Sequence, residues 1–484
     1  MTSYAARIFT GRSHAARVVL AALMLGAAGA RVGVAQEGAD PEGEGAGDGM
    51  TIGALLGIGV EHIPDDDGVG ATWQSLTLAP ELSAGKFSLG LGAQLRFRFD
   101  GGPAGSEWEI REEDWSPDES VAGRSFLDLF LPIIRHARYG GDGEPLVVRA
   151  GSFEDATLGT GFLLGEYANT ALLPGRRLFG VDLDIDGAVF NVPVAGLETV
   201  VGHVPALDVM GARLWARPMY ALSMPLLSSL RIGAVAAADF DPFRYVPDTD
   251  EEGSVSAFGF DLEVPVVATP SFSATAHGDV VLLGTSEIDS RSVGTAVGLS
   301  GTAVSNLRYG LQLRLTDDRF LPVYFDRDYD RQRADKFRAL RAAERATTQA
   351  DALEGLVHAG WAARVGTSLL DRRIDLDLGL SGPLSGAGGA LAEIPYAQRN
   401  GLDVKGRVGV RDLGVDGMSF DLDYRKRQLD SLGDLTEPEH LSVGTALSYR
   451  TNGTLIILSY RGYYDPAADG LVGAPAVESW IELF

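Results

Sequence analysis

Hydrophobic and polar residues alternate without interruption from residue 86 to residue 99. Phe, Leu and Ala occupy every second position, and Lys, Arg, Gln, Ser and Gly occupy the positions between them. A strict period of two predicts a β-strand with one apolar face and one polar face. The same alternation recurs in residues 306–315, 374–381, 402–411 and 420–425.

The lengths and polar faces of these segments favour a membrane barrel over a soluble sandwich. Many of the alternating runs extend over 9 to 14 residues, and a tilted strand needs roughly 9–11 residues to cross a bilayer. Their polar faces combine full charges with glycine, as expected of a wall that meets water inside a wide barrel. We therefore expect an all-β fold, a transmembrane antiparallel up-and-down β-barrel.

The whole chain contains about 20 such segments, with a range of 16–22. The expected strands are 51–61, 71–82, 86–99, 124–139, 145–153, 181–191, 196–204, 211–221, 228–239, 254–265, 270–283, 292–301, 304–315, 357–369, 372–381, 401–411, 416–427, 440–450, 453–463 and 475–484. Segment 124–139 also fits a helical pattern, and its loss together with a partner strand leaves 18 strands.

The connections between the expected strands alternate in length. Short links such as 83–85 and 451–452 fall between long ones such as 154–180 and 316–356. Outer-membrane barrels have short periplasmic turns on one rim and longer loops on the other. Because the expected number of strands is even, both ends of the barrel are expected on the periplasmic side.

The first 50 residues predict two segments outside the barrel. Three arginines precede an apolar run at 18–30, which is too short to span a bilayer as a helix. We expect residues 1–35 to be a Sec-type signal peptide that is cleaved during export. Residues 36–50 contain five acidic side chains and no aromatic or β-branched residue, which predicts a disordered acidic leader. The barrel domain is then 51–484.

Charge and cysteine content exclude several classes of function. The formal net charge is −25, and so acidic a chain repels nucleic acid. The chain has no cysteine, which excludes a lipid-modified N-terminal Cys, a disulfide framework, a thiol nucleophile and a Cys-containing zinc site. After the expected signal peptide no apolar stretch is long enough for a transmembrane helix.

The C-terminal residues 479–484 (SWIELF) resemble those of bacterial outer-membrane β-barrel proteins of the porin type. In that class the final strand usually ends in an aromatic residue, commonly Phe, which the barrel-assembly machinery reads. Phe484 and Trp480 match this habit. Glu482 shares their face, where the class has an aromatic or apolar residue, so that either the strand is bulged there or Glu482 lies at the membrane interface. The resemblance implies an outer-membrane location, contact with outer-membrane lipid and assembly by that machinery.

Charged residues on the polar faces are candidates for a pore lining. Charged rings set ion preference in narrow pores, although the same residues can simply form a salt-bridged, solvated inner wall. Asp182, Asp184 and Asp186 could instead suggest calcium, but a period of two within a strand favours one charged stripe, and no metal site is expected. The candidate pore-lining residues are Arg96, Arg98, Asp182, Asp184, Asp186, Arg308, Arg314, Asp375, Asp377, Lys405, Arg407, Asp421, Asp423 and Arg425.

Two long loops are candidates for a constriction. Loop 316–356 contains a stretch rich in Ala, Arg, Leu and Glu that predicts a locally basic helix at 331–349. We expect this helix to fold into or over the barrel mouth, with an exposed, solvated helix as the alternative. Loop 154–180 is apolar and glycine-rich, so its backbone can lie close to a wall. The candidate constriction residues are Glu166, Arg176, Arg177, Arg331 and Arg338.

The histidines and the size of the barrel bear on function. None of the six histidines after residue 35 lies within five residues of another, so paired metal-binding spacing is absent; we expect neither enzymatic activity nor a cofactor. A barrel of about 20 strands encloses more space than its wall side chains fill. We therefore expect a porin-like channel for diffusion or uptake of small hydrophilic solutes. The alternative is a non-conducting outer-membrane surface protein that binds an external partner through its long acidic loops.

Overall fold

The computed structural model describes most of the chain after residue 49. The described residues are 50–484 without 65–69, 101–106, 116–125, 142, 247–248, 288–290, 305, 318, 350–357, 385–400, 413–414 and 466–467. The expected signal peptide (1–35) and all of the expected leader (36–50) except Met50 lie outside the described residues.

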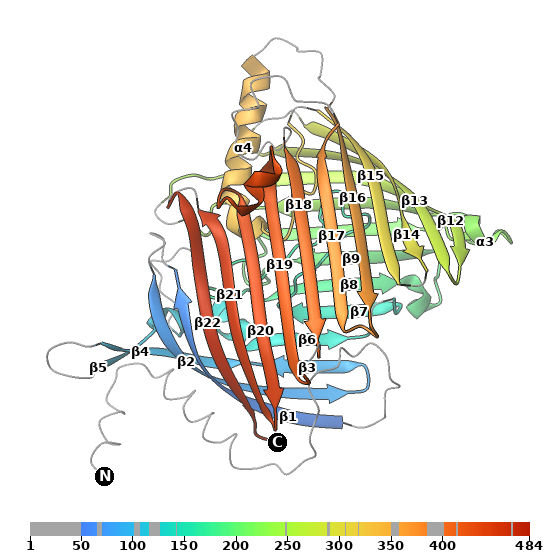
Figure 1. Ribbon diagram of the computed structural model, residues 1–484. Helices are drawn as coiled ribbons and strands as arrows, with labels where there is room; N and C mark the ends of the chain where they lie inside the picture. The colour runs from blue at the N-terminus through green and yellow to red at the C-terminus, as the bar shows by residue number, and fades with distance from the viewer. Residues whose placement is uncertain are drawn as a thin grey trace.

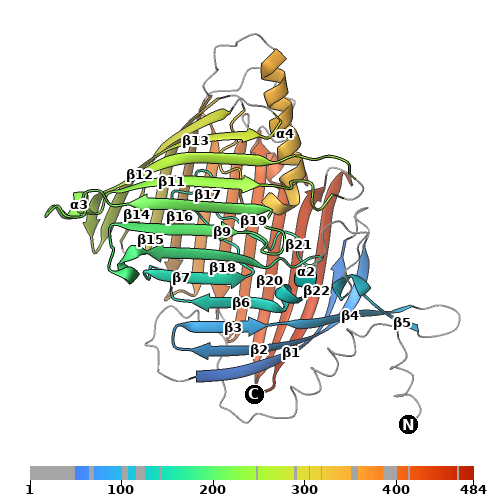
Figure 2. The ribbon, with the colours of Figure 1, turned by 180° about the vertical axis from the view of Figure 1, so that it is seen from behind.

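One antiparallel sheet closes on itself to form a barrel, which Figures 1 and 2 show from opposite sides. The closure is the pairing of the last strand with the first, in which Leu55 lies opposite Glu482 and Glu61 opposite Ala476. The first strands are β1 (Met50–Ile63), β2 (Ala71–Ala84), β3 (Phe87–Leu91), β4 (Ala93–Asp100), β5 (Glu107–Ile110), β6 (Ile134–Tyr139), β7 (Leu146–Gly151), β8 (Gly180–Asp186), β9 (Ala195–Val201), β10 (Val209–Ala216) and β11 (Arg231–Asp239). The others are β12 (Val255–Thr269), β13 (Phe272–Thr285), β14 (Ser292–Ala303), β15 (Leu307–Thr316), β16 (His358–Leu369), β17 (Ile374–Pro383), β18 (Leu402–Arg411), β19 (Met418–Leu429), β20 (Leu441–Thr451), β21 (Thr454–Asp465) and β22 (Gly470–Glu482).

The 22 strand segments fill 20 positions around the barrel. β3 and β4 are two halves of one strand, interrupted at Gly92, because both pair with β2. β5 and β6 share the next position, since β5 pairs with β4 and β6 pairs with β3. The expected all-β, up-and-down antiparallel barrel of about 20 strands is confirmed.

The expected strand 124–139 is a strand only in its second half. A short helix, α2 (Phe126–Phe130), and a 3-10 turn at Leu131–Ile133 precede β6. Pro132 lies in that turn, and proline has no N–H to donate to a strand ladder. The prediction of a strand was therefore wrong over residues 126–133, where the apolar pattern belongs to short helices.

The two rims of the barrel differ in the length of their connections. On one rim, which we call the turn rim, tight links such as 85–86 and 452–453 join consecutive strands. The backbone of Phe484 binds that of Ala54 near this rim. On the other, the loop rim, the chain makes the long excursions 152–179 and 317–357.

The second excursion contains the main helix of the protein, α4 (Tyr329–Gln349), which confirms the helix expected at 331–349. Figures 1 and 2 show α4 running from among the strands at the barrel mouth to beyond their ends. In the described part of the chain, no helix is both long and apolar enough to cross a membrane.

The outer face of the barrel is apolar. Along β15, Leu311, Leu313 and Leu315 are more than half exposed, whereas Gln312 and Arg314 between them point inward and are partly covered. A band of apolar side chains in water is unfavourable by about 25 cal/mol per Å², so this face favours contact with lipid. Exposed apolar residues on other strands include Leu214, Ile232, Phe258, Phe260, Leu262, Val280, Val297, Val365, Leu378, Phe420, Leu458 and Val477.

The C-terminal strand explains the glutamate in the terminal signature. Val477 and Ile481 are 51% and 44% exposed on the outer face, whereas Trp480 is 8% exposed. The Trp480 Nε1 donates to the carboxylate of Glu478 (2.8 Å). Glu482 shares this inner face, and its pairing with β1 is regular. It therefore lies inside the barrel, and the strand is not bulged at that point.

Two loop-rim excursions fold back into the barrel and fill part of it. We call residues 152–179 and 317–349 together the lumen insert. Their apolar side chains pack in one buried cluster with inward-facing residues of β9 to β14. The insert residues of this cluster are Phe153, Ala156, Leu158, Phe162, Leu163, Leu164, Tyr167, Phe320, Tyr324, Phe325, Tyr329, Ala334, Phe337 and Leu340. The apolar character of residues 153–167 thus reflects burial against the wall.

Two wall glycines leave the space that the lumen insert occupies. A Cβ atom on Gly211 of β10 would lie 2.7 Å from the Leu158 side chain and 3.2 Å from that of Leu164. A Cβ atom on Gly294 of β14 would lie 2.2 Å from the ring of Phe320. Carbon atoms attract best at about 3.5–4.0 Å, so larger residues at these positions displace the insert.

Candidate functional site

The two parts of the lumen insert are joined by backbone hydrogen bonds. The Phe325 N–H donates to the Leu163 carbonyl (3.2 Å), and the Gly165 N–H donates to the Phe325 carbonyl (3.1 Å). The Val323 N–H donates to the carbonyl of Phe162 (2.9 Å). Buried backbone groups need such partners because water does not reach them. The insert is therefore one folded unit, although its parts are far apart in sequence.

A buried ionic cluster attaches the first turns of α4 to the barrel wall. Arg333 donates to Asp208 (2.7 Å) and to Asp239 (2.9 Å), and the Tyr167 hydroxyl donates to Asp330 (2.9 Å). None of these four charged residues is more than 2% exposed. Burial raises the pKa of Asp330 to about 7 against the opposing influence of Arg333. One guanidinium thus serves three buried carboxyl groups.

The outer part of α4 is held by carboxylates from two other loops. Arg338 and Arg341 each lie 2.6 Å from Glu251, which precedes β12. Arg341 and Arg345 lie 3.2 Å and 2.5 Å from Glu287, which follows β13. These pairs are partly exposed, and such pairs contribute roughly 0–1 kcal/mol each. They fix the direction of the helix at the loop rim.

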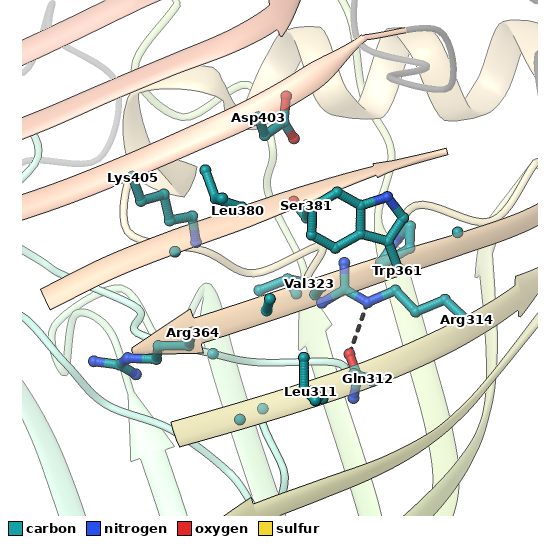
Figure 3. Close-up of a pocket in the computed structure, with 18 of the residues that line it drawn as sticks. Leu311, Gln312, Arg314, Val323, Trp361, Arg364, Leu380, Ser381, Asp403 and Lys405 are labelled. Atoms are coloured by element: carbon teal, nitrogen blue, oxygen red, sulfur yellow. Dashed lines mark hydrogen bonds between the residues drawn. The ribbon is translucent and has the colours of Figure 1, made fainter. Parts of the chain in front are cut away.

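A cavity of about 770 Å³ lies between the lumen insert and the wall formed by β12 to β19. Arg314, Arg364 and Lys405 reach it from β15, β16 and β18, as Figure 3 shows. The Arg314 Nε donates to Gln312 Oε1 (2.7 Å). A cavity of this size accommodates a small organic solute.

Glu166 of the lumen insert reaches across the cavity to the opposite wall. Its Oε1 lies 2.8 Å from Nη1 of Arg364, and its Oε2 lies 3.7 Å from Nζ of Lys405. Although burial opposes ionisation, Lys405 and Arg364 hold the pKa of Glu166 below its usual value. The ionised carboxylate therefore bridges the insert and the wall and narrows the cavity.

Cations outnumber carboxylates in the cavity lining. The lining cations are Arg308, Arg314, Lys336, Arg364, Lys405, Arg425, Lys426 and Arg427, and the lining carboxylates are Glu166, Glu263, Asp326, Asp377 and Asp403. The excess is local, because the whole chain has a net charge of −25. Arg314 forms no ion pair with any residue that the structure describes. Its charge faces the cavity, where Asp403 and Asp279 act on it without forming a salt bridge, and low-dielectric walls strengthen the field.

Six of the residues expected from the sequence line this cavity. They are Glu166, Arg308, Arg314, Asp377, Lys405 and Arg425. Five of the six come from the strand alternation and one from the glycine-rich loop. They come from five separate segments of the chain, which the barrel brings to one side of the lumen.

The other strand candidates do not line this cavity. Some form ion pairs, and the others are located by the residues opposite them on neighbouring strands. The ion pairs are Arg96 with Glu61, Arg98 with Glu109, Asp182 with Arg149, Asp186 with Arg217, and Arg407 with Asp423. Asp375 and Asp421 both lie opposite Gly409, and Asp184 lies opposite Glu198. Within the described residues, no group of three or more His, Asp or Glu side chains could hold a metal ion.

The remaining loop candidates hold the lumen insert in place. Their contacts are Arg176 with the Tyr245 ring (4.8 Å), Arg331 with the Tyr463 ring (4.0 Å) and Arg338 with Glu251 (2.6 Å). Arg177 lies in the same stretch as Arg176, and burial, together with the nearby Arg135 and Arg96, lowers its pKa to about 10. These arginines are thus distributed along the insert, away from the Glu166 bridge.

Sequence reasoning missed several residues of the cavity. Arg364 lies on the polar face of the expected strand 357–369, between Ala362 and Gly366, which are small and hide the alternation. The strand register was the signal that could have found it, because Arg364 lies opposite Gly310 of β15. Lys336 comes from α4, where its Nζ donates to the Tyr324 carbonyl (2.8 Å). No local period predicts that contact.

Comparisons with known proteins give a fold resemblance at low identity. No protein-family model matches the sequence, and no curated protein does. Among solved structures, it aligns with OccAB2 from Acinetobacter baumannii (TM-score 0.35, 10% identity, 91% of this chain and 99% of that one). It also aligns with OccK11 (OpdR) from Pseudomonas aeruginosa (TM-score 0.35, 10% identity, 90% and 96%). With CdiB from Acinetobacter baumannii the TM-score is 0.27 at 7% identity over 89% of this chain, which spans 60% of the length of CdiB. At such scores we infer function from the chain's own residues.

Proposed function

We propose that the protein is a bacterial outer-membrane channel through which small hydrophilic solutes diffuse, with a preference for anions. The observation that carries the proposal is the cavity of about 770 Å³ inside a closed barrel, in which lining cations outnumber carboxylates. Export by the signal peptide at 1–35 and insertion by the barrel-assembly machinery belong to the same proposal.

The outer face of the barrel supports the membrane location. Residues such as Leu313 and Phe260 are 55% and 62% exposed and alternate with inward-facing polar residues. A closed ladder has no free edge, so its backbone groups are satisfied without water. Both features suit a wall whose outside meets hydrocarbon and whose inside meets water.

The cavity lining supports the preference for anions. A solute that crosses between the lumen insert and the wall passes Arg314, Lys405 and the Glu166 bridge. Of these three, only Glu166 is negative, and Arg364 and Lys405 compensate its charge. Fixed cations attract anions more strongly where the surrounding wall excludes water.

Recordings from the purified protein in a planar bilayer test the proposal. We expect discrete ohmic current steps. Under a KCl gradient, we expect a reversal potential whose sign shows that chloride permeates better than potassium. If insertion is verified and the bilayer carries no current, the proposed channel function is wrong. That result would favour a non-conducting surface protein that binds an external partner through acidic loops.

A further inference from the structure

The turn rim carries one long connection among short ones. Residues 217–230, between β10 and β11, include the short helix α3 (Pro225–Ser228), which projects beyond the strand ends in Figures 1 and 2. The neighbouring turn 187–194, between β8 and β9, is bound to it. The Arg217 N–H donates to the Val194 carbonyl (2.7 Å), and its Nη1 donates to the Pro193 carbonyl (2.8 Å). We call these two segments together the rim patch.

The rim patch exposes large apolar side chains. Phe190 is 67% exposed and Met224 is 58% exposed. The exposed large apolar residues of the patch are Val189, Phe190, Val192, Val194, Met219, Tyr220, Leu222, Met224 and Leu226. Contiguous apolar surface of this kind marks contact with a protein or a membrane. Barrel turns that face only water are not expected to expose such apolar side chains.

The rim patch continues the apolar outer face of the strands that precede and follow it. Leu214, near the end of β10, is 64% exposed, and Ile232, near the start of β11, is 47% exposed. On its other side, α3 contacts β12, where Val266 is 47% exposed. The patch is therefore an extension of the surface that faces lipid.

The rim patch carries no free charge that water would have to solvate. Residues 187–194 and 217–230 contain no acidic residue, although the chain has a net charge of −25. The only charged residue within them is Arg217, which forms an ion pair with Asp186 at the end of β8 (2.7 Å). Apolar and aromatic side chains with a compensated charge suit a segment that lies at the boundary between headgroups and acyl chains.

We propose that the rim patch inserts into the membrane leaflet that borders the turn rim. The inference rests on the proposed membrane location. Lipid contact then extends farther toward the turn rim on the β8 to β11 side than on the side of β2 and β3. Phe190 and Met224 then lie in the leaflet.

Single cysteines can test this directly, because the chain has none of its own. Phe190→Cys and Met224→Cys probe the patch, Ser83→Cys probes an exposed position elsewhere on the turn rim, and Leu313→Cys probes the lipid-facing wall. Each full-length variant carries a bimane label in nanodiscs of phosphatidylethanolamine and phosphatidylglycerol. Doxyl-labelled lipid then serves as the quencher, and heat-modifiable migration verifies folding.

We expect both patch labels to be quenched about as strongly as the label at Leu313, and at least about twofold more than the label at Ser83. Quenching at Leu313 without quenching at either patch site overturns this inference and leaves the membrane location standing. Absence of quenching at Leu313 overturns the membrane location itself. Efficient bismaleimide crosslinking between two Met224→Cys copies assigns the patch to a second copy and also overturns the inference.

Discussion

At the scale of single residues, Arg314 is a cation of the cavity lining that forms no salt bridge with any described residue. Arg314→Glu replaces a cation of the lining by an anion, and we expect the chloride-to-potassium permeability ratio to fall by about threefold or more. Reversal potentials in a KCl gradient measure it. Arg98→Glu is the matched control, since Arg98 pairs with Glu109 away from the cavity. Equal ratios in both variants would remove Arg314 from the selectivity of the channel.

Wall glycines provide a second test with single residues. Gly211→Ala places a methyl group 2.7 Å from Leu158, and overpacking of this kind costs about 1–3 kcal/mol. We expect a lower midpoint of thermal unfolding and higher conductance from a displaced insert. Gly406→Ala is the control, because no atom lies within 4 Å of the added Cβ. If the two variants unfold at the same temperature, the insert does not press on the wall at Gly211.

At the scale of elements, the attachment of α4 depends on pH through Asp330. Burial raises the pKa of its carboxyl group from the usual 3.8 to about 7, so the folded state binds this proton more tightly than the unfolded state does. The protonated Asp330 carboxyl therefore stabilises the folded state. This contribution is complete below about pH 4 and is lost as the pH rises through 7. The groups that face Asp330 are Tyr167, Arg333, Asp208 and Asp239.

A spin label on α4 reports this pH dependence. Ala342→Cys places the label at an exposed position of the helix, and we expect its mobility to increase between pH 4 and pH 7.5. Asp330→Asn keeps the site neutral and should abolish the increase over that range. Asp335→Asn, at a partly exposed position of the same helix, is the control and should leave the increase in place. An unchanged pH response in Asp330→Asn would assign the transition to another group.

Deletion tests α4 as a whole element. The helix is part of the lumen insert and packs through Phe337 and Leu340 against the buried cluster inside the barrel. Removing residues 331–349 should raise single-channel conductance, because it removes bulk and charge from the mouth. Conductance equal to that of the intact protein would show that solutes do not pass α4.

At the scale of the whole molecule, the closed hydrogen-bond ladder from β1 to β22 predicts a barrel that stays folded in detergent until it is heated. We expect the unboiled protein to migrate faster than the boiled protein on a denaturing gel, with no effect of reducing agents, since the chain has no cysteine. Fractionation should place it in the outer membrane. A soluble periplasmic product would contradict the barrel in a membrane.

The order and number of strands could be predicted because the period of two is a local property. Residues 86–99 show their inner and outer faces without reference to any partner, and neighbouring strands then pair in sequence order. The prediction was wrong at residues 126–133, where a short apolar stretch fits two periods equally well. The sequence alone therefore determined an up-and-down barrel with a helix in its longest loop.

Only the tertiary structure decided which charged residues share one cavity. Arg314 and Lys405 lie on β15 and β18, and Glu166 reaches them from a loop between β7 and β8. That loop docks because Gly211 leaves space for its apolar side chains, and α4 docks because Arg333 meets carboxylates from two distant segments. These are contacts between segments far apart in the chain, and no local period encodes such contacts, because each depends on the closure of the whole barrel.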